Sequence, residues 1–437
     1  MKLRQIIMLS ILAVLPAISG CSGEPEVIPD SSVSEYSDRA SSPFDSMSDT
    51  VTIETPKLQY LGSKDLTDSP AYELYIKSYA PDYVGDVIEW ERVSARNLAN
   101  RLTERISSDL SPDLCDKIGN SLPYLAKRNL YEDLTGYIDI TAPQWIPYAE
   151  YITSAGAGKG QYFYPASITV SPYVLLYKKS AFPRYNTANP LTLWNDGEWT
   201  LDAMTRSLGN SSVRGTAVAE NLLASSGISL FSVDKNGKVT SNLHSEVFSD
   251  SARIIAGCTN PQNGQTGLKS GIEALQSGEI LYLSINEVEL SEVRRTYPDS
   301  GLEIVPFPRG DSADKHYYYA LAEGYLVPKR AGNIKGAASF INCARIAAEN
   351  SGDIFEASSE LTESDVRTLS VLRSTELSQA IFDTNYCLDA DANSAVSGIF
   401  AGISSNGDDA QALDEFIRNI EAPILRSISE INQNSDK

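Results

Sequence analysis

Strand-like and helix-like patterns alternate three times between residues 56 and 130, and this alternation constrains the fold most strongly. The segments PKLQYLG (56–62), DVIEWERV (86–93) and DLCDKI (113–118) have the apolar or alternating pattern of strands. Helical patterns follow them at 69–81, from residue 94, and at 121–130. Such alternation is typical of a parallel sheet that is covered by helices.

Proline and serine mark the ends of these helices. Ser69 is a favourable N-cap, Pro70 suits the first helical position, and Pro81 ends the segment. Ser94 is the expected N-cap of the second helix. The buried stripe of that helix is expected to consist of Ala95, Leu98, Leu102 and Ile106.

Polar turns follow the first and third strand patterns, as GSKD (62–65) and IGN (118–120). The carboxyl ends of parallel strands lie at one edge of a sheet, where ligands of α/β proteins bind. We therefore expect both turns on the same rim, although their spacing alone favours ordinary strand-to-helix turns.

The chain from residue 56 to 437 is too long for one ordinary core and predicts two lobes. Pro165 and Pro172 divide two extended stretches within 160–182, and a helix-rich middle follows. Strands are expected at 277–285 and 324–328, a tight turn at 234–238, and an amphipathic helix at 336–349. Pro423 is expected to kink a C-terminal helix. The apolar face of that helix is expected to be Leu413, Phe416, Ile417, Ile420, Ile424 and Ile428.

The first 20 residues have the layout of an export signal. Two basic residues precede an apolar run at 6–15, which is too short to span a bilayer. The segment ISG (18–20) directly before Cys21 resembles the processing box of bacterial lipoproteins, which implies a lipid-bearing Cys21; a plain signal peptide is the alternative. Residues 21–55 are rich in Ser, Asp, Glu and Pro and are expected to form a flexible tether.

The formal charge of −21 argues against nucleic acid or anionic lipid headgroups as partners, because both would repel the chain.

Cysteines 115, 258, 343 and 387 lie far apart, and no CxxC or zinc-type spacing occurs. An exported protein could pair them, but Cys115 and Cys343 lie in apolar patterns that favour free buried thiols.

Six segments follow one another in a fixed order between about 112 and 400. The first two are SPDLCDKIGNSLPYLAKRNLYEDLTGYI and YVLLYKKSAFPRYNTANPLTLWNDGEWTLDAM. The later ones are LLASSGISLFSVDKNGKVTSN, ALQSGEILYLSI, IVPFPRG and GYLVPKRAGNIKGAASFINCA. Together, and in this order, they resemble the family 1 extracellular solute-binding proteins of ABC importers.

The resemblance implies an α/β, periplasmic-binding-protein-like fold of two lobes, each a mostly parallel sheet flanked by helices, joined by crossing hinge strands. Lobe 1 is expected at 56–165 with return segments from the C-terminal half, lobe 2 mainly at 166–345, and C-terminal helices across both at 346–437. Hinge closure around a ligand would give a permease a distinct shape to recognise.

The same resemblance implies an oligosaccharide or related polar solute in the cleft between the lobes. Its motifs indicate which residues are candidates for contact with the ligand. They are Ser63, Lys64, Asn120, Tyr164, Ser167, Glu220, Asn221, Asn286, Glu287, Tyr319 and Glu323. Gly119 lies beside Asn120 in the same turn. Two positions depart from the family, because Ile118 stands where relatives carry a polar residue and Val288 where many carry tryptophan. The carboxylates Glu220, Glu287 and Glu323 would also suit a cationic ligand.

Other polar and aromatic groups are expected to be structural. Trp194 and Trp199 lie where the family has a helix start, which favours packing over ligand stacking. The cluster at 389–393 resembles the opening of a calcium loop but lacks its glycine and later glutamate.

No catalytic motif supports an enzyme. The two histidines, His244 and His316, lie near no nucleophile motif, and GxSxG, HExxH and P-loop sequences do not occur. We expect a monomeric, cofactor-free binding lipoprotein that serves permease subunits at the outer face of a membrane, in a cell without an outer membrane. A lipid-anchored glycoside hydrolase and a binding protein that reports to a sensor kinase are the alternatives.

Overall fold

The structure is a computed structural model of the 437-residue chain. It describes residues 56–117, 121–122, 124–155, 160–185, 188–209, 211–234, 238–259, 267–298, 300–356, 360–382, 388–406 and 409–433. The expectations for the export signal, lipidated Cys21, the tether, Asn120 and Cys387 lie outside these residues, as does the centre of the expected turn at 234–238. Residues 51–437 form one compact unit.

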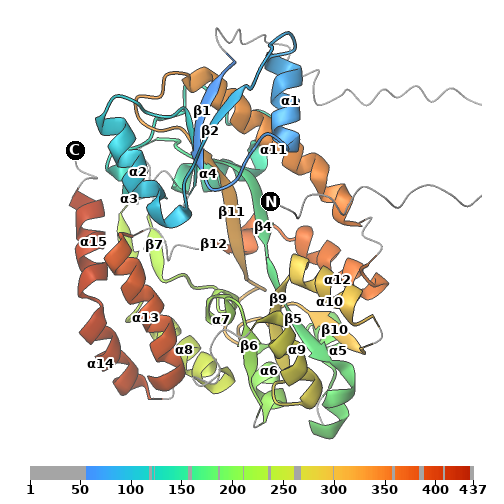
Figure 1. Ribbon diagram of the computed structural model, residues 1–437. Coiled ribbons are helices and arrows are strands. Elements are labelled where there is room, and N and C mark those ends of the chain that lie inside the picture. The colour runs from blue at the N-terminus through green and yellow to red at the C-terminus, as the bar shows by residue number, and fades with distance from the viewer. Residues whose placement is uncertain are drawn as a thin grey trace, which may run out of the picture. The chain divides into compact units, whose positions relative to one another are not determined.

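The first sheet has six strands in the order β12-β11-β3-β1-β2, with β4 paired to β11 (Figure 1). Strand β1 pairs in parallel with β2 and β3, which confirms the parallel arrangement expected from the first three strand patterns. Strand β11 runs antiparallel to β3 and β4 and parallel to β12. The strands are β1 (Leu58–Gly62), β2 (Ile88–Arg92), β3 (Leu114–Asp116), β4 (Tyr164–Val170), β11 (Tyr318–Leu326) and β12 (Ala380–Phe382).

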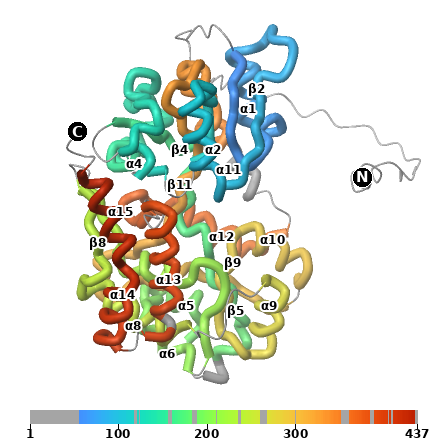
Figure 2. The backbone as a smooth tube through the Cα atoms, turned by 60° about the vertical axis from the view of Figure 1, so that its left-hand side comes forward, coloured from blue at the N-terminus to red at the C-terminus, as the bar shows by residue number. Residues whose placement is uncertain are grey.

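Helix α1 (Pro70–Tyr79) begins and ends as its sequence predicts. The Ser69 side chain accepts a hydrogen bond from the Tyr72 backbone N–H, and the helix ends before Pro81. Its buried Tyr75 meets Phe340 of α11 (Ile334–Glu356) edge to face, with ring centroids 5.7 Å apart. The two helices lie side by side against the first sheet (Figures 1 and 2).

Helix α2 (Ala95–Ser107) buries Leu98 and Leu102, while Ile106 is half-buried and Ala95 is exposed. Only the central part of the expected stripe therefore faces the core. Ser94 occupies the N-cap position, but its side chain makes no capping hydrogen bond. The third helix of this region, α3 (Tyr124–Lys127), is much shorter than its pattern predicts.

The second sheet, in the order β10-β5-β9-β6, corrects one expectation. Strand β5 (Tyr173–Lys178) runs antiparallel to both β9 (Tyr282–Asn286) and β10 (Leu302–Val305), so this sheet is not mostly parallel. Only β6 (Val213–Gly215) pairs in parallel with β9. The β9–α10–β10 unit, in which α10 spans Glu287–Thr296, is itself a parallel crossover, and the distant strand β5 inserts between its two strands.

Other elements surround this sheet. A short antiparallel pair, β7 (Phe231–Val233) with β8 (Val239–Ser241), flanks the expected tight turn. Helices η3 (Ile146–Tyr148) and α4 (Ala149–Ala155) pack in the core of the first sheet instead. The remaining helices before the C-terminal group are η4 (Lys179–Tyr185), α5 (Pro190–Asn195), α6 (Leu201–Leu208), α7 (Val218–Ser225), α8 (Glu246–Cys258), α9 (Leu268–Ser277), α10 (Glu287–Thr296), α12 (Glu363–Arg373) and η5 (Leu377–Gln379).

Three C-terminal helices, α13 (Ala390–Asn406), α14 (Ala410–Ile420) and α15 (Ala422–Gln433), pack beside α8 and β8 (Figure 2). The expected kink at Pro423 is instead a break at Glu421, because proline fits the first turn of a new helix. The predicted apolar face is otherwise correct, with Leu413, Ile417, Ile424 and Ile428 buried.

Several buried groups have the structural roles expected of them. The thiols of Cys115, Cys258 and Cys343 are buried and unpaired, which confirms the expectation for Cys115 and Cys343. Burial raises the pKa of Cys258 to about 11 and that of Cys343 to about 12, so both thiols stay protonated. Trp199 is buried, and its indole N–H donates to the Pro306 carbonyl at 2.8 Å, so it packs structurally as expected.

Candidate functional site

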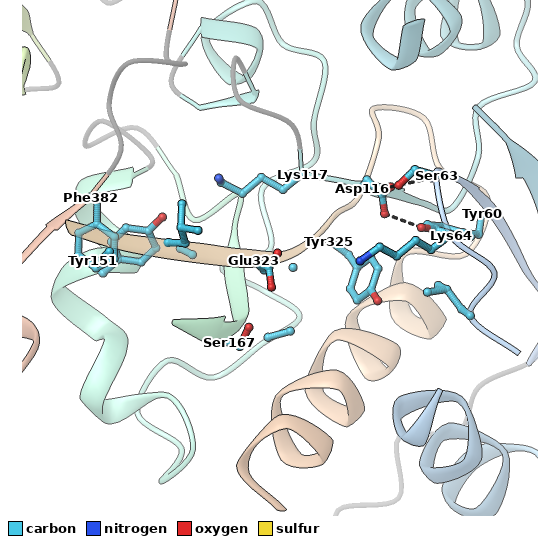
Figure 3. Close-up of a pocket in the computed structure, with 16 residues that line it drawn as sticks. Tyr60, Ser63, Lys64, Asp116, Lys117, Tyr151, Ser167, Glu323, Tyr325 and Phe382 are labelled. Carbon is cyan, nitrogen blue, oxygen red and sulfur yellow. Dashed lines mark hydrogen bonds between the residues drawn. The ribbon is translucent and has the colours of Figure 1, made fainter. Parts of the chain in front are cut away.

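A cavity of about 450 Å³ opens beyond the carboxyl ends of β1 and β3, on the rim that the sequence predicts. Its walls come from strands of the first sheet, the turn after β1, and helix α4 (Figure 3). It is lined by Tyr60, Ser63, Lys64, Leu66, Asp116, Lys117, Tyr151, Ala166, Ser167, Ala320, Leu321, Ala322, Glu323, Gly324, Tyr325 and Phe382.

Asp116, the last residue of β3, holds the turn after β1. Its Oδ2 accepts hydrogen bonds from the Ser63 backbone N–H at 2.8 Å and from Ser63 Oγ at 2.9 Å. Its Oδ1 accepts a hydrogen bond from the Tyr60 hydroxyl. A Cβ at Gly62 would lie 1.9 Å from the same hydroxyl, so only glycine fits this turn. The turn is thereby fixed with Lys64 next to the cavity (Figure 3).

Tyr60 and Tyr325 form one aromatic end of the cavity, with ring centroids 6.1 Å apart at 80°. Burial, assisted by the hydrogen bond to Asp116, raises the pKa of Tyr60 well above its usual range. Burial likewise raises the pKa of Tyr325 to about 12. Both phenols therefore keep their protons near neutral pH. The Tyr60 proton is donated to Asp116, whereas the Tyr325 hydroxyl can donate to a ligand.

Tyr151 of α4 and Phe382 of β12 form the other aromatic end (Figure 3). Their ring centroids lie 4.2 Å apart at 35°, and Tyr151 also meets Phe163 edge to face. Such flat apolar surfaces suit the apolar face of a sugar ring.

Charged groups lie between these two ends. The Lys117 ammonium lies 5.5 Å from the centroid of the Phe163 ring, and the Lys64 side chain also lines the cavity (Figure 3). Glu323 faces the cavity at a β-bulge between Glu323 and Gly324. A Cβ at Gly324 would lie 3.0 Å from the Ala166 backbone nitrogen, so this position favours glycine. Within the described residues, the Glu323 carboxylate has no hydrogen bond or ion pair.

Four candidate residues from the sequence line this cavity: Ser63, Lys64, Ser167 and Glu323. Tyr164 lies elsewhere, because its ring is fully buried and meets Trp145 edge to face at 5.0 Å. Its hydroxyl donates to the Ile138 carbonyl at 3.2 Å, so Tyr164 belongs to the core.

The candidates on α7, α10 and the outer part of β11 lie away from this cavity. The Asn221 side chain is buried and donates to the Ala217 carbonyl at 2.7 Å, and Glu220 is half-buried in the first turn of α7. Asn286 caps α10 in a reciprocal capping box with Glu289. Tyr319 is buried in β11.

Glu287 lines a second cavity of about 500 Å³ beside β4. Its carboxylate pairs with Arg373 at 3.2 Å. Arg345 in the same wall donates to the Ala166 carbonyl at 2.9 Å and to the Tyr148 hydroxyl at 2.7 Å. Ser167 lines both cavities. The polar groups of this second wall therefore already bind one another.

The first cavity, between the Tyr60–Tyr325 and Tyr151–Phe382 ends, is called the main cavity. Sequence reasoning missed six of its polar or aromatic residues. They are Tyr60, Asp116, Lys117, Tyr151, Tyr325 and Phe382. The position of Asp116 and Lys117 at the end of the third strand pattern was a usable signal, because the same rim argument applies to them. No local signal marks Tyr151 or Phe382, since tertiary folding alone brings α4 to β12.

Solved structures of binding proteins align with most of the chain. A family 1 extracellular solute-binding protein from Bifidobacterium longum subsp. infantis aligns with a TM-score of 0.58 and 14% identity, over 84% of this chain and 99% of that chain. The cyclic alpha-maltosyl-1,6-maltose binding protein from Arthrobacter globiformis aligns with a TM-score of 0.57 and 14% identity, over 83% and 98%. An ABC substrate-binding protein from Listeria monocytogenes, in complex with cycloalternan, aligns with a TM-score of 0.54 and 15% identity, over 84% and 98%. No family model and no curated protein matches the chain in sequence.

The chain has the fold of the solute-binding proteins. The α/β, two-lobe architecture expected from the sequence is thereby confirmed, apart from the strand directions of the second sheet. In the part of the chain that the structure describes, no helix is both long and apolar enough to cross a membrane. The same residues hold no cluster of three or more metal-ligating side chains.

Proposed function

We propose that this protein reversibly binds an oligosaccharide, or a related polar solute, for an ABC importer. The observation that carries the proposal is the main cavity, which combines aromatic rings at both ends with polar groups between them. Sugars need this combination, because their rings have apolar faces and their edges carry hydroxyls. The fold supports the proposal, since oligosaccharide-binding proteins share it.

The proposal includes a lipid anchor at Cys21 and delivery of the solute to permease subunits at the outer face of the membrane. One lipid chain holds a protein only weakly, so stable anchoring needs more than one. Residues 21–55 would then keep the cavity near the permease and raise its effective concentration there.

The proposal includes no catalysis. A glycoside hydrolase needs two carboxyl groups that act on the bound sugar. The cavity has Asp116 and Glu323, but both oxygens of Asp116 already accept hydrogen bonds from Tyr60 and Ser63. Neither histidine lines the cavity: His244 lies between Asp414 and Glu421, and burial lowers the pKa of His316 to about 4.

Thermal unfolding and calorimetric titration with sugars, polyols, amino sugars and polyamines test the binding function. We expect at least one oligosaccharide to raise the unfolding temperature without releasing reducing sugar. Tyr151→Ala removes half of one aromatic end and is expected to weaken binding about tenfold. Tyr137→Ala, which removes a tyrosine that is 44% exposed outside the cavity, is the matched control. Stabilisation by a polyamine alone would refute the sugar assignment.

Metabolic labelling with a palmitate analogue tests the anchor in a bacterial host. The full chain is expected to take up label and sediment with membranes, and Cys21→Ser is expected to abolish both. Ser22→Ala next to it should leave them unchanged. Equal labelling of the Cys21→Ser variant would overturn the anchor proposal.

A further inference from the structure

The charges of the main cavity differ from those that the sequence led us to expect. Of the three carboxylates that favoured a cationic ligand, only Glu323 lines this cavity. Glu287 pairs with Arg373, and Glu220 lies on α7. Two lysines, Lys64 and Lys117, line the cavity instead, although the whole chain has 36 basic against 57 acidic residues.

Asp116 keeps its negative charge in the cavity, but its oxygens are engaged by the turn after β1 and are not open acceptors for a ligand. Its two oxygens accept three hydrogen bonds from Tyr60 and Ser63, so they hold the turn after β1. In Figure 3 this hydrogen-bonded group lies at one side, while the Lys64 side chain extends from the same turn into the cavity. Within the described residues, the Lys64 ammonium has no ion pair or hydrogen bond.

The two lysines extend toward different aromatic ends of the cavity. In the view of Figure 3, the Lys64 side chain lies on the side of Tyr60 and Tyr325, and Lys117 extends toward the side of Tyr151 and Phe382. A sugar ring on either aromatic end would therefore have an ammonium group beside it. Ammonium groups bind carboxylates more strongly than hydroxyls, because the hydrogen bond is charge-assisted.

We propose that the ligand is an acidic oligosaccharide whose carboxylate is bound by Lys64. This inference rests on the proposed sugar-binding function and narrows its ligand class. Glu323 accepts hydrogen bonds from ligand hydroxyls at the middle of the cavity, and the aromatic ends contact the sugar rings.

The net charge of −21 does not prevent an anionic ligand from binding. Exposed charges are screened beyond a Debye length of about 8 Å at physiological ionic strength. The charged groups that line the cavity therefore decide the local interaction, and the distant surface carboxylates contribute little. Among the groups that line the cavity, the Lys64 ammonium is the one placed to bind a ligand carboxylate.

Calorimetric titration with matched pairs of neutral and acidic saccharides tests this inference. Lactose is compared with 3′-sialyllactose, and galactobiose with digalacturonic acid, each at the same concentration and ionic strength. We expect the acidic member of at least one pair to bind at least about tenfold more tightly, as one charge-assisted hydrogen bond predicts. Added salt should weaken the acidic member more than the neutral one.

The Lys64→Gln variant tests whether Lys64 itself, rather than the net charge of the protein, determines the affinity for an acidic saccharide. The variant is expected to lose about tenfold in affinity for the acidic saccharide and less than about threefold for the neutral one. Lys57→Gln removes the same charge from an exposed lysine that pairs with Glu89 outside the cavity, and it should change neither affinity. The unfolding temperature of both variants should match that of the parent.

The outcomes distinguish this inference from the proposed function. Equal or tighter binding of the neutral saccharides, or equal effects of Lys64→Gln and Lys57→Gln, would refute the acidic ligand and leave sugar binding intact. No binding of any saccharide would overturn both. A preference for the acidic member that Lys64→Gln removes would support both.

Discussion

Polar residues lie at the ends of both β1 and β9, but their roles differ. Ser63 and Lys64 follow β1, and Asn286 and Glu287 lie at the end of β9. After β1, Asp116 binds Ser63 and leaves Lys64 beside the cavity. After β9, a helix begins at once, so Asn286 caps it and Glu287 pairs with Arg373. Polar residues after a strand are thus available to a ligand only where no helix or counter-ion uses them.

The largest expected effect belongs to the second sheet, where charges stabilise the fold. Arg294 of α10 makes a bidentate ion pair with Asp365 of α12, with both N–O distances 2.7 Å and both residues buried. Asp365→Ala leaves a buried guanidinium without its partner and should lower the free energy of unfolding by about 3–5 kcal/mol. Denaturant unfolding measures this loss in the free energy of unfolding. Glu363→Ala, at an exposed position of the same helix, should be nearly neutral.

The saccharide affinity of the Asp365→Ala variant tests whether this second region affects stability alone. The Asp365→Ala variant should bind saccharide as the parent does at temperatures where it is folded, since α12 does not line the main cavity. A loss of affinity without a loss of stability would show that the second region contributes directly to binding.

Asp116→Ala should have the next largest effect and should change both stability and affinity. The Tyr60 hydroxyl and two Ser63 donors would lose their acceptor, at a cost of about 1–3 kcal/mol for the group. The freed turn would no longer hold Lys64 beside the cavity. Unfolding and calorimetric titration measure the two effects. Asp116→Asn keeps acceptor oxygen and should retain part of both; equal losses in the two variants would contradict this role.

Asn286→Ala should have a smaller effect, on stability alone. Loss of the N-cap hydrogen bond to the Glu289 backbone, 2.9 Å long, costs about 1 kcal/mol. Asn286→Ser, which preserves a capping oxygen, should be nearly neutral. Thermal unfolding gives the stability, and titration with a saccharide gives the affinity. Weaker binding by the alanine variant would mean that Asn286 contacts the ligand.

The sequence predicts much of the first sheet but little of the second. Strand and helix periods and the cap at Ser69 are local signals, and the structure retains them in β1, β2, β3 and α1. The directions in the second sheet depend on the insertion of β5 between β9 and β10, which no local pattern encodes.

The residues of the site divide in the same way, into those that local sequence marks and those that only tertiary folding brings together. Ser63 and Lys64 follow the first strand pattern, and the family resemblance adds Ser167 and Glu323; all four line the cavity. Asn286 was a plausible candidate by the same reasoning, yet its partner Glu289 makes it a cap. The aromatic end of Tyr151 and Phe382 depends on the docking of distant elements, so sequence position gives no guide to it.

The smallest expected effect is a pH dependence of stability that originates outside the cavity. His244 lies between two carboxylates of the C-terminal helices, with Nδ1 2.7 Å from Asp414 and Nε2 2.7 Å from Glu421. Partial burial lowers the pKa of His244, but the hydrogen bonds to Glu421 and Asp414 outweigh burial and raise it above its ordinary value. Arg418 also pairs with Asp414, at 2.8 Å.

A raised folded pKa means that the folded state binds the proton more tightly than the unfolded state. The stabilisation is therefore complete below the unfolded value of about 6.5 and is lost as pH rises through the folded pKa. Denaturant unfolding at several pH values from 6 to 9 should show falling stability, with a shallower slope for His244→Gln. Affinity for a saccharide should stay constant over this window, because the phenols of Tyr60 and Tyr325 keep their protons there. An equal slope in the parent protein and the His244→Gln variant would show that the pair of carboxylates does not stabilise the imidazolium. A pH-dependent affinity would place a titrating group in the cavity.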